Sequence, residues 1–194
     1  MNNKQLTELF QKIGEKDVQY KRARLIVLQN ASQGNFWLIG GFLYRTLVKA
    51  LYGGTDYAKD FDFIVENPNP CLSLPSGWTL SENRFRNPKF ISDESEIDFV
   101  PLKEVYAIKK RSLPHSLDSF LCGTPLNIHS LAYEVRTHEI FGDIGISSLE
   151  QKIIRVNDMG MAEDFAKLYN TTVEEIISRK ADELGFRPEY PKPL

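Results

Sequence analysis

The stretches FWLIGGFLYRTLVKALYGG (Phe36 to Gly54) and KDFDFIVE (Lys59 to Glu66) decide the fold of this chain. The first begins as a short apolar run that ends in a glycine pair, Gly40 and Gly41, as expected of a buried strand that turns directly into a helix. Beyond the pair, apolar residues recur at helical intervals until two further glycines, which predict the end of that helix. The second stretch is rich in β-branched and aromatic residues and predicts another strand.

Helices are predicted before this strand–helix–strand unit. Leu6, Phe10 and Ile13 lie at helical spacing, and a second apolar set follows at residues 25–28. We therefore expect two N-terminal helices, the second broken by the polar residues 30–35.

More strands are predicted after the unit. Residues 78–90 alternate well enough for one or two strands, and EIDFV (Glu96 to Val100) predicts another, which Pro101 closes. Residues 138–143 and 152–156 are also typical of strands.

The sequence pattern of the later helices is less regular. Residues 102–111 are typical of a helix, and residues 126–135 indicate a helix that passes into a strand. Thr171 and Glu174 have the spacing of a capping box that starts a last helix, which Gly185 ends. The sum is an α+β fold, a mixed β-sheet flanked by helices. We expect N-terminal helices in residues 1–35, a central domain in residues 36–156, and a helical C-terminal extension with a proline-rich tail in residues 157–194.

The composition is that of a soluble globular protein. Of the 194 residues, 42% are hydrophobic and 26% are charged. The formal net charge is −2, so the overall charge does not indicate nucleic-acid binding. It does not exclude a local basic groove. The two cysteines, Cys71 and Cys122, lack metal-site spacing and are expected to be reduced thiols. Without a signal peptide or a membrane span, the expected location is the cytoplasm, and no membrane partner is expected.

Three aspartates carry the chemistry that the sequence predicts. Asp60 and Asp62 are two residues apart on one strand, so they project from the same face, and Asp98 lies on the strand EIDFV. If the two strands are neighbours, the three carboxylates converge. Carboxylate oxygens are ligands that Mg²⁺ prefers, and such a cluster can hold two ions, with Mn²⁺ as an alternative to Mg²⁺.

The glycine pair suits a phosphate group. A strand that ends in Gly40 and Gly41 and continues as a helix lets backbone N–H groups approach a triphosphate without a Cβ in the way. Arg45, one helical turn further, could reach a phosphate, and Lys59 could assist.

Each of these features alone has an ordinary structural explanation. Two aspartates on a strand usually mark a solvated face, and a glycine pair is usually a tight turn. Their order favours the functional interpretation, because a strand, a glycine pair and a helix are followed by a strand with Asp60 and Asp62 and then by a strand with Asp98.

This order of motifs resembles the nucleotidyltransferase superfamily that includes polymerase beta. More narrowly, it is similar to the head domain of bacterial poly(A) polymerases and CCA-adding tRNA nucleotidyltransferases, in which a strand leads to GG-x-V-R-D, a helix, D-x-D and a later strand with a third Asp. The residues at corresponding positions here are Gly40, Gly41, Asp60, Asp62 and Asp98. Residues 127–156 resemble the family's stretch TINALAYD and the hairpin, turn and strand after it. The likeness implies a nucleotidyltransferase-like sheet and metal binding by the three aspartates.

The chain departs from the family's pattern at two motifs. Tyr44 and Arg45 stand where the family has R-D after GG-x-V, and residues 123–126 stand where it has R-R-D-F, a motif implied in ribose recognition. The resemblance therefore implies neither sugar discrimination nor nucleotide choice. Of the family's neck, at most one helix is expected, at residues 177–186, and domains that grip tRNA are not expected.

For the histidines, one basic run and several aromatic residues, we expect structural roles. His115, His129 and His138 lack metal-site spacing and are expected to be surface or structural residues. The basic run Lys109, Lys110 and Arg111 is expected to be a solvated helix end, with an RNA or nucleotide phosphate contact as the alternative. Three aromatic residues are expected in the core rather than as stacking platforms: Trp78, Phe85 and Phe90.

The function predicted first is a metal-dependent nucleotidyltransferase that moves a nucleoside monophosphate from an NTP, with ATP or CTP favoured, to an acceptor hydroxyl and releases pyrophosphate. The acceptor could be an RNA 3′ end, a protein or a small molecule. One alternative is a nucleotide-binding or regulatory module that kept the fold and lost turnover. Another is a toxin–antitoxin component, which rests on analogy of fold. The oligomeric state is left open.

Overall fold

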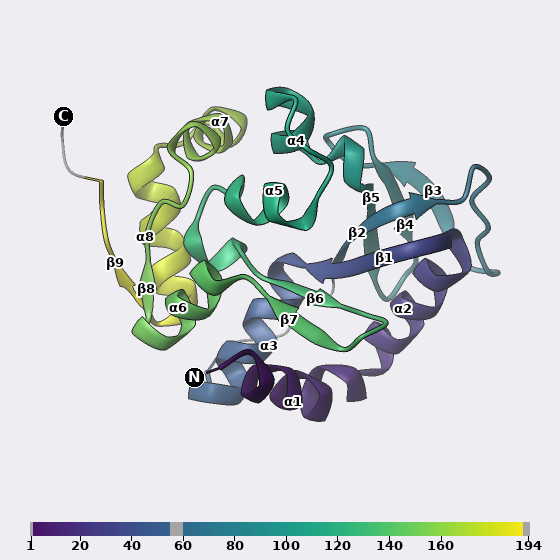
Figure 1. Cartoon of the computed structure of the whole chain (residues 1–194), viewed down its shortest axis with the longest axis horizontal. Coiled ribbons are helices and arrows are strands. Elements are labelled where there is room, and N and C mark those ends of the chain that lie inside the picture. Colours follow the sequence, from purple (N-terminus) through teal and green to yellow (C-terminus); the bar gives the residue numbers. More distant parts are fainter. Residues whose placement is uncertain (1, 55–59, 192–194) are drawn as a thin grey trace.

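The computed structural model describes residues 2–54 and 60–191, which form a mixed sheet with helices on both faces (Figure 1). The sheet of the described residues has seven strands, which lie in the order β3 (Thr79–Glu82), β4 (Pro88–Ile91), β5 (Glu96–Pro101), β2 (Asp60–Pro68), β1 (Ala31–Ile39), β6 (Ala132–Glu134) and β7 (Glu139–Phe141). Strands β2 and β5 are parallel, whereas the other neighbouring strands are antiparallel. The expected α+β architecture is confirmed.

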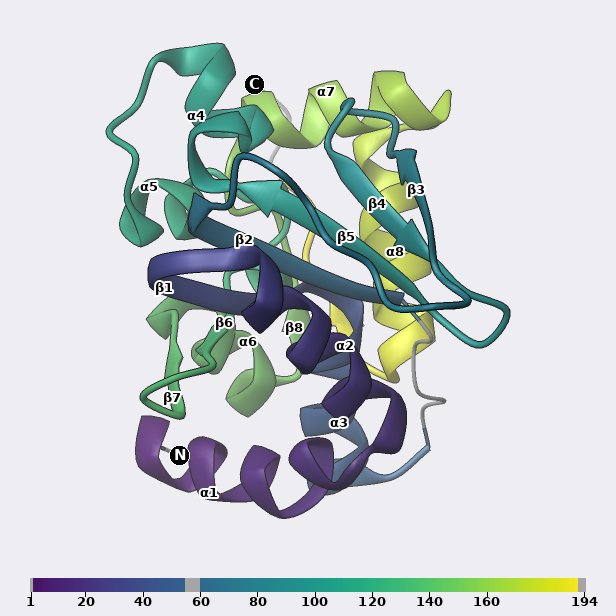
Figure 2. The same cartoon turned by 90° about the vertical axis from the view of Figure 1, so that its right-hand side faces the viewer.

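Three helices cover one face of this sheet: α1 (Asn3–Ile13), which continues into the 3₁₀ turn η1 (Gly14–Lys16), then α2 (Val18–Asn30) and α3 (Gly40–Tyr52) (Figures 1 and 2). An aromatic cluster fills the space between them and the sheet. Tyr20 stacks on Phe42 with ring centroids 5.4 Å apart, and Phe42 meets Phe61 edge-on at 4.8 Å. Since Phe61 and Phe63 alternate with Asp60 and Asp62 along β2, burial of the rings points the carboxylates to the opposite face.

That opposite face carries a smaller apolar layer. The segments that cover it are η2 (Leu102–Glu104), α4 (Tyr106–Arg111) and α5 (Leu117–Cys122). Beneath them Trp37, Ile64 and Ala132 are buried together with Phe120. This layer covers Ile64 of β2, two residues beyond Asp62, and so closes the sheet face on that side of the carboxylates.

The C-terminal part packs against α3. Its elements are η3 (Asn127–His129), α6 (Asp143–Gln151), β8 (Ile153–Ile154), α7 (Met159–Tyr169), α8 (Val173–Leu184) and β9 (Arg187–Pro188), with β8 and β9 paired in parallel. Ile177 and Ala181 of α8 belong to the same buried cluster as Leu43 and Leu47 of α3. Residues on both sides of position 156, where the C-terminal extension was expected to begin, therefore share one core.

Several element boundaries differ from the sequence predictions. Strand β1 begins at Ala31 rather than Phe36, because the polar residues 31–35 pair with the far end of β2 through irregular register. The helix expected at residues 102–111 is split into η2 and α4 by the extended backbone of Val105. Helices α6 and α7 were not predicted.

The capping box of α8 lies one residue later than predicted. The Thr172 hydroxyl accepts from the Glu175 N–H, and the Glu175 carboxylate accepts from the Thr172 N–H and from the Thr171 hydroxyl. The helix therefore starts at Val173, one residue later than the predicted cap implies, and Gly185 ends it in a left-handed conformation, as predicted.

None of the helices in residues 2–54 and 60–191 combines the length and the apolar character that a membrane crossing requires.

A single buried amide joins η3 to β8. The Asn127 side chain, on a residue only 3% exposed, donates to the Ile153 carbonyl at 2.9 Å and accepts from the Arg155 and Ile128 N–H groups at 3.0 Å. Asn127→Ala should lower the free energy of unfolding by about 2–3 kcal/mol, because buried backbone groups lose their partners. Urea denaturation measures this loss. The exposed Asn3→Ala is the control and should change stability by less than about 0.5 kcal/mol; equal effects of the two variants would contradict the role of Asn127.

Candidate active site

The three predicted aspartates lie on one face of the β2–β5 pair. Asp62 is directly opposite Asp98 in the parallel register, and Asp60 precedes Asp62 by two residues on the same face. The two strands are neighbours, which was the condition for the carboxylates to face the same site. Asp60 is exposed, whereas Asp62 and Asp98 are partly buried, so the row runs from solvent inward.

The glycine turn between β1 and α3 is shaped by Asp62. Gly40 has a φ of +72°, and a Cβ at this position would lie 2.1 Å from Oδ2 of Asp62. The Gly41 N–H donates a hydrogen bond to the Asp62 carboxylate. Gly40 is therefore needed both for its backbone conformation and for the close approach of this carboxylate. From the sequence, we expected the glycine pair only to bind a triphosphate. That role stays a prediction.

The charge of Asp62 is only partly compensated. Burial, and then the negative charges of Asp98 and Asp60, raise its pKa to about 7. The Gly41 N–H and the ammonium group of Lys89 act in the opposite direction. The arrangement thus holds carboxylates together at a cost in electrostatic repulsion, which a cation would offset.

Lys89 of β4 is a site residue that sequence reasoning missed. It is opposite Asp98 in the β4–β5 register, and its ammonium group pairs with Glu96 at 2.5 Å. Desolvation alone would lower the pKa of Lys89, but the hydrogen bond to Glu96 and the charges of Asp98 and Asp60 outweigh it and raise the pKa. Lys89 is therefore a fixed positive charge beside the carboxylates.

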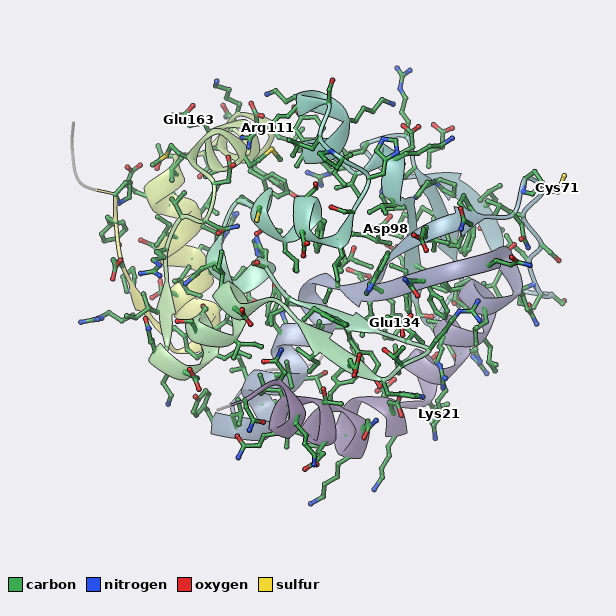
Figure 3. All side chains as sticks on the ribbon, in the orientation of Figure 1. Lys21, Cys71, Asp98, Arg111, Glu134 and Glu163 are labelled. Carbon is green, nitrogen blue, oxygen red and sulfur yellow. The ribbon has the colours of Figure 1, made fainter. Side chains whose placement is uncertain are left out.

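A cleft of about 750 Å³ opens over the carboxylates, a size typical of small-molecule sites. Every predicted site residue that the structure describes lines it: Gly40, Gly41, Arg45, Asp60, Asp62 and Asp98. Lys59 lies outside the described residues. Figure 3 places Asp98 on the side of the sheet that faces α4. Gly123, Thr124 and Pro125 also line the cleft.

The turn between β3 and β4 is tied to Asp98. The Asn83 side chain donates to Oδ1 of Asp98 at 3.1 Å and accepts from the N–H groups of Phe85 and Asn87. Phe85 lines the cleft and packs on Tyr106 of α4. The expectation that Phe85 is a core residue is therefore wrong, whereas Phe90 is fully buried as expected.

Arg45 belongs to a polar network with α8. Its Nε donates to Glu183 at 2.6 Å, and Glu183 also pairs with Lys180, whose ammonium group donates to the Tyr44 hydroxyl at 2.8 Å. His129 packs beside Tyr44, and burial together with Lys180 lowers its pKa to about 3, so its imidazole is neutral. Sequence reasoning missed Lys180 and Glu183, because more than 130 residues separate them from Arg45.

The basic run at the end of α4 is ion-paired rather than simply solvated. Lys110 pairs with Asp164 and Arg111 with Asp158, and these bonds join α4 to α7. Both cartoon views place the two helices side by side, and Figure 3 shows Arg111 at their junction. The other two histidines are exposed (His115) or bonded to Glu15 and Tyr133 (His138), as expected of surface and structural residues.

The donor set fits a divalent cation, although the carboxylates are spread along the strands. Within the described part of the chain, no three His, Cys, Asp or Glu side chains already converge as a metal site. Asp62 nevertheless lies opposite Asp98 in the strand register, and burial together with the negative charges of Asp98 and Asp60 raises its pKa. A hard cation would offset this concentration of negative charge. Magnesium at this site stays a prediction.

Comparisons with known proteins agree with the fold. No protein-family model matches this chain. No curated protein sequence matches it. Among solved structures, a CCA-adding enzyme with CTP matches with a TM-score of 0.61 at 16% identity over 97% of this chain and 43% of that one. The Thermotoga maritima CCA-adding enzyme complexed with tRNA matches with a TM-score of 0.56 at 15% identity over 89% of this chain and 40% of that one. A CCA-adding enzyme with ATP matches with a TM-score of 0.50 at 19% identity over 80% of this chain and 35% of that one.

The chain thus shares its fold with part of each of these CCA-adding enzymes. It spans less than half the length of these solved structures. The resemblance noted in the sequence is confirmed at the level of the fold.

The contact between Gly40 and Asp62 predicts a measurable energetic coupling. Gly40→Ala should destabilise the protein by more than the roughly 1–2 kcal/mol that a left-handed alanine costs, because the new Cβ displaces the carboxylate. Gly77→Ala supplies the control, since Gly77 has a φ of +85° and open space around it. Adding Asp62→Ala to Gly40→Ala should recover part of the loss in urea denaturation. Strictly additive effects would contradict the contact.

The raised pKa of Asp62 predicts a pH dependence of stability in EDTA. The folded state holds the proton more tightly than the unfolded chain, so this contribution to stability is present at low pH and is lost as pH rises through about 7. Asp62→Asn should remove that loss and raise the unfolding temperature at pH 8, by about 2–4 °C for each kcal/mol recovered. The difference from the wild type should vanish at pH 4; a constant difference at both pH values would be inconsistent with this assignment.

Proposed function

We propose that this protein is a metal-dependent nucleotidyltransferase, which transfers a nucleoside monophosphate from an NTP to an acceptor hydroxyl and releases pyrophosphate. One observation carries the proposal: the parallel register sets Asp62 beside Asp98, with Asp60 on the same face and the glycine turn against Asp62. The fold shared with CCA-adding enzymes supports it.

The carboxylates divide into two roles. Asp60 and Asp62 would hold both of two Mg²⁺ or Mn²⁺ ions, and Asp98 would hold the one on the acceptor side. When bound, the ions would lower the pKa of the acceptor hydroxyl and neutralise charge on the phosphates. Asn83 fixes the orientation of Asp98 through its amide.

The transfer balances without a further reactant. The acceptor oxygen forms a bond to the α-phosphorus, the bond from that phosphorus to the bridging oxygen breaks, and pyrophosphate leaves with the electron pair. The hydroxyl proton passes to Asp98 and then to water. Lys89 is a fixed charge beside Asp98, and Arg45 lies one helical turn beyond the glycine turn, where a triphosphate would extend.

ATP or CTP is the proposed donor. The solved structures of this fold include CCA-adding enzymes with CTP and with ATP. In this chain Gly123 and Thr124 replace the ribose motif, and the Thr124 hydroxyl bonds to the backbone carbonyls of Leu121 and Leu126. The hydroxyl is therefore engaged within the cleft wall, and we expect weak discrimination between ribose and deoxyribose.

Pyrophosphate release tests the proposal. With Mg²⁺ or Mn²⁺, each of the four NTPs in turn and total cellular RNA as an acceptor pool, the wild type should release pyrophosphate and favour one NTP. Asp62→Asn and Asp98→Asn should each lower the rate by about 10³-fold or more, since a metal ligand is lost. EDTA should abolish release.

The exposed Asp118 of α5, which does not line the cleft, provides the matched control, and Asp118→Asn should retain full activity. If the wild type binds an NTP without releasing pyrophosphate, and Asp62→Asn loses that binding, the protein is a nucleotide-binding module and not an enzyme. Release that survives in both site variants would overturn the proposal.

A further inference from the structure

Tyr44 of α3 stands where the GG-x-V-R-D motif has its arginine, and its hydroxyl is bonded to a lysine of α8. The Lys180 ammonium group donates to the Tyr44 hydroxyl at 2.8 Å and to Glu183 at 2.6 Å. Tyr44 is only 4% exposed, yet it lines the cleft beside the glycine turn, whereas Lys180 does not line it. The positive charge that an arginine would bring to this position therefore comes from α8 and meets the cleft through the phenol.

The Tyr44 hydroxyl has a proton to donate. A phenol combines one O–H donor with an oxygen that accepts. The oxygen accepts from Lys180, and within the part of the chain that the structure describes no group accepts the Tyr44 proton. Because the Lys180 ammonium group polarises the phenol, the O–H is a stronger donor than that of an isolated tyrosine. The hydroxyl is thus suited to a negatively charged group in the cleft.

The geometry of α3 places the Tyr44 ring over the glycine turn. Tyr44 follows Gly41 by three residues, so the two lie on the same side of the helix, and helical side chains lean toward the N-terminus of their helix. The first N–H groups of a helix favour a phosphate there. The Gly41 N–H also bonds to Asp62, so this end of α3 adjoins the row of carboxylates.

The side chains around Tyr44 favour an anion. Arg45 and Lys180 share the carboxylate of Glu183, so these three side chains together carry a net positive charge. The His129 ring lies 5.8 Å from the Tyr44 ring, and its imidazole is neutral because burial and Lys180 lower its pKa to about 3. Lys180 is therefore the group that charges the Tyr44 hydroxyl, and the histidine does not share this role.

We propose that Tyr44 donates a hydrogen bond to the leaving pyrophosphate, and that Lys180 positions and polarises the Tyr44 hydroxyl for this contact. This inference rests on the proposed function and names two further residues for the same reaction. As the bond between the α-phosphorus and the bridging oxygen breaks, negative charge grows on the pyrophosphate. The Tyr44 O–H points at that charge and keeps its proton. Since the charge is larger in the transition state than in the bound NTP, the contact acts on kcat.

Steady-state kinetics of pyrophosphate release tests both residues. Tyr44→Phe removes only the hydroxyl and should lower kcat about 10²-fold with little change in the KM for the NTP. Lys180→Ala should also lower kcat, but it should add almost nothing to Tyr44→Phe, because both act through one hydroxyl. Lys180→Arg should restore part of the rate. Tyr52→Phe on the same helix is the matched control, since the Tyr52 hydroxyl bonds to the Leu149 carbonyl outside the cleft, and it should retain kcat.

The basicity of the leaving group gives a readout that a structural role would not move. A β,γ-difluoromethylene analogue of the preferred NTP has a less basic leaving group than the β,γ-methylene analogue, so it needs less stabilisation by a donor. The ratio of the wild-type rate to the Tyr44→Phe rate should therefore be smaller with the difluoromethylene analogue. Equal ratios with the two analogues would overturn the inference.

Binding of pyrophosphate itself separates this inference from the proposed function. In isothermal titration with magnesium pyrophosphate, Tyr44→Phe should raise the Kd about 10-fold, and Tyr52→Phe should leave it unchanged. Release at the wild-type rate in Tyr44→Phe would overturn the inference and leave the proposed function intact. Pyrophosphate binding that weakens in Tyr44→Phe, without release from any NTP, would support the contact and contradict the enzyme. Neither binding nor release in the wild type would contradict both.

Discussion

The parallel pairing of β2 with β5 is the constraint on which the rest of the site depends. It sets Asp62 beside Asp98 and keeps Asp60 in the same row, while Phe61 and Phe63 of the same strand enter the aromatic core with α2 and α3. Like charges in such a row repel one another, and the fold holds them by burying the alternate residues. The core therefore positions the carboxylates, and burial, together with the negative charges of Asp98 and Asp60, raises the pKa of Asp62.

The glycine turn and the β3–β4 turn close on this row from opposite sides. Because Gly40 has no Cβ, the Asp62 carboxylate can lie against it, and Asn83 donates a hydrogen bond to Asp98. The C-terminal helices complete the cleft, because α7 brings aromatic rings to its rim and Glu183 of α8 binds Arg45. The C-terminal part of the chain thus forms one wall of the cleft.

The sequence predicted the parts of the site that depend on local pattern. The glycine pair and the alternation of aspartates with aromatic residues are visible within a few positions, and their order along the chain indicated the fold. Asn83 and Lys89 could not be found in this way, because their role arises from lying next to Asp98. Phe85 was missed because its place in the cleft depends on its contact with Tyr106 of α4. The network of Arg45 with α8 depends on tertiary packing over more than 130 residues, which no local pattern records. The capping box was misplaced by one residue, since Thr171 and Thr172 each precede a glutamate by three positions.

The number of bound metal ions shows whether Asp60, Asp62 and Asp98 form a metal site. Titration of Mn²⁺ into the protein with a non-hydrolysable ATP or CTP analogue, followed by electron paramagnetic resonance of the free ion, gives the number of ions bound per chain. We predict two bound ions in the wild type and a loss of binding in Asp62→Asn and Asp98→Asn, with Asp118→Asn unchanged. Absence of bound Mn²⁺ in the wild type, or full binding in both site variants, would contradict it.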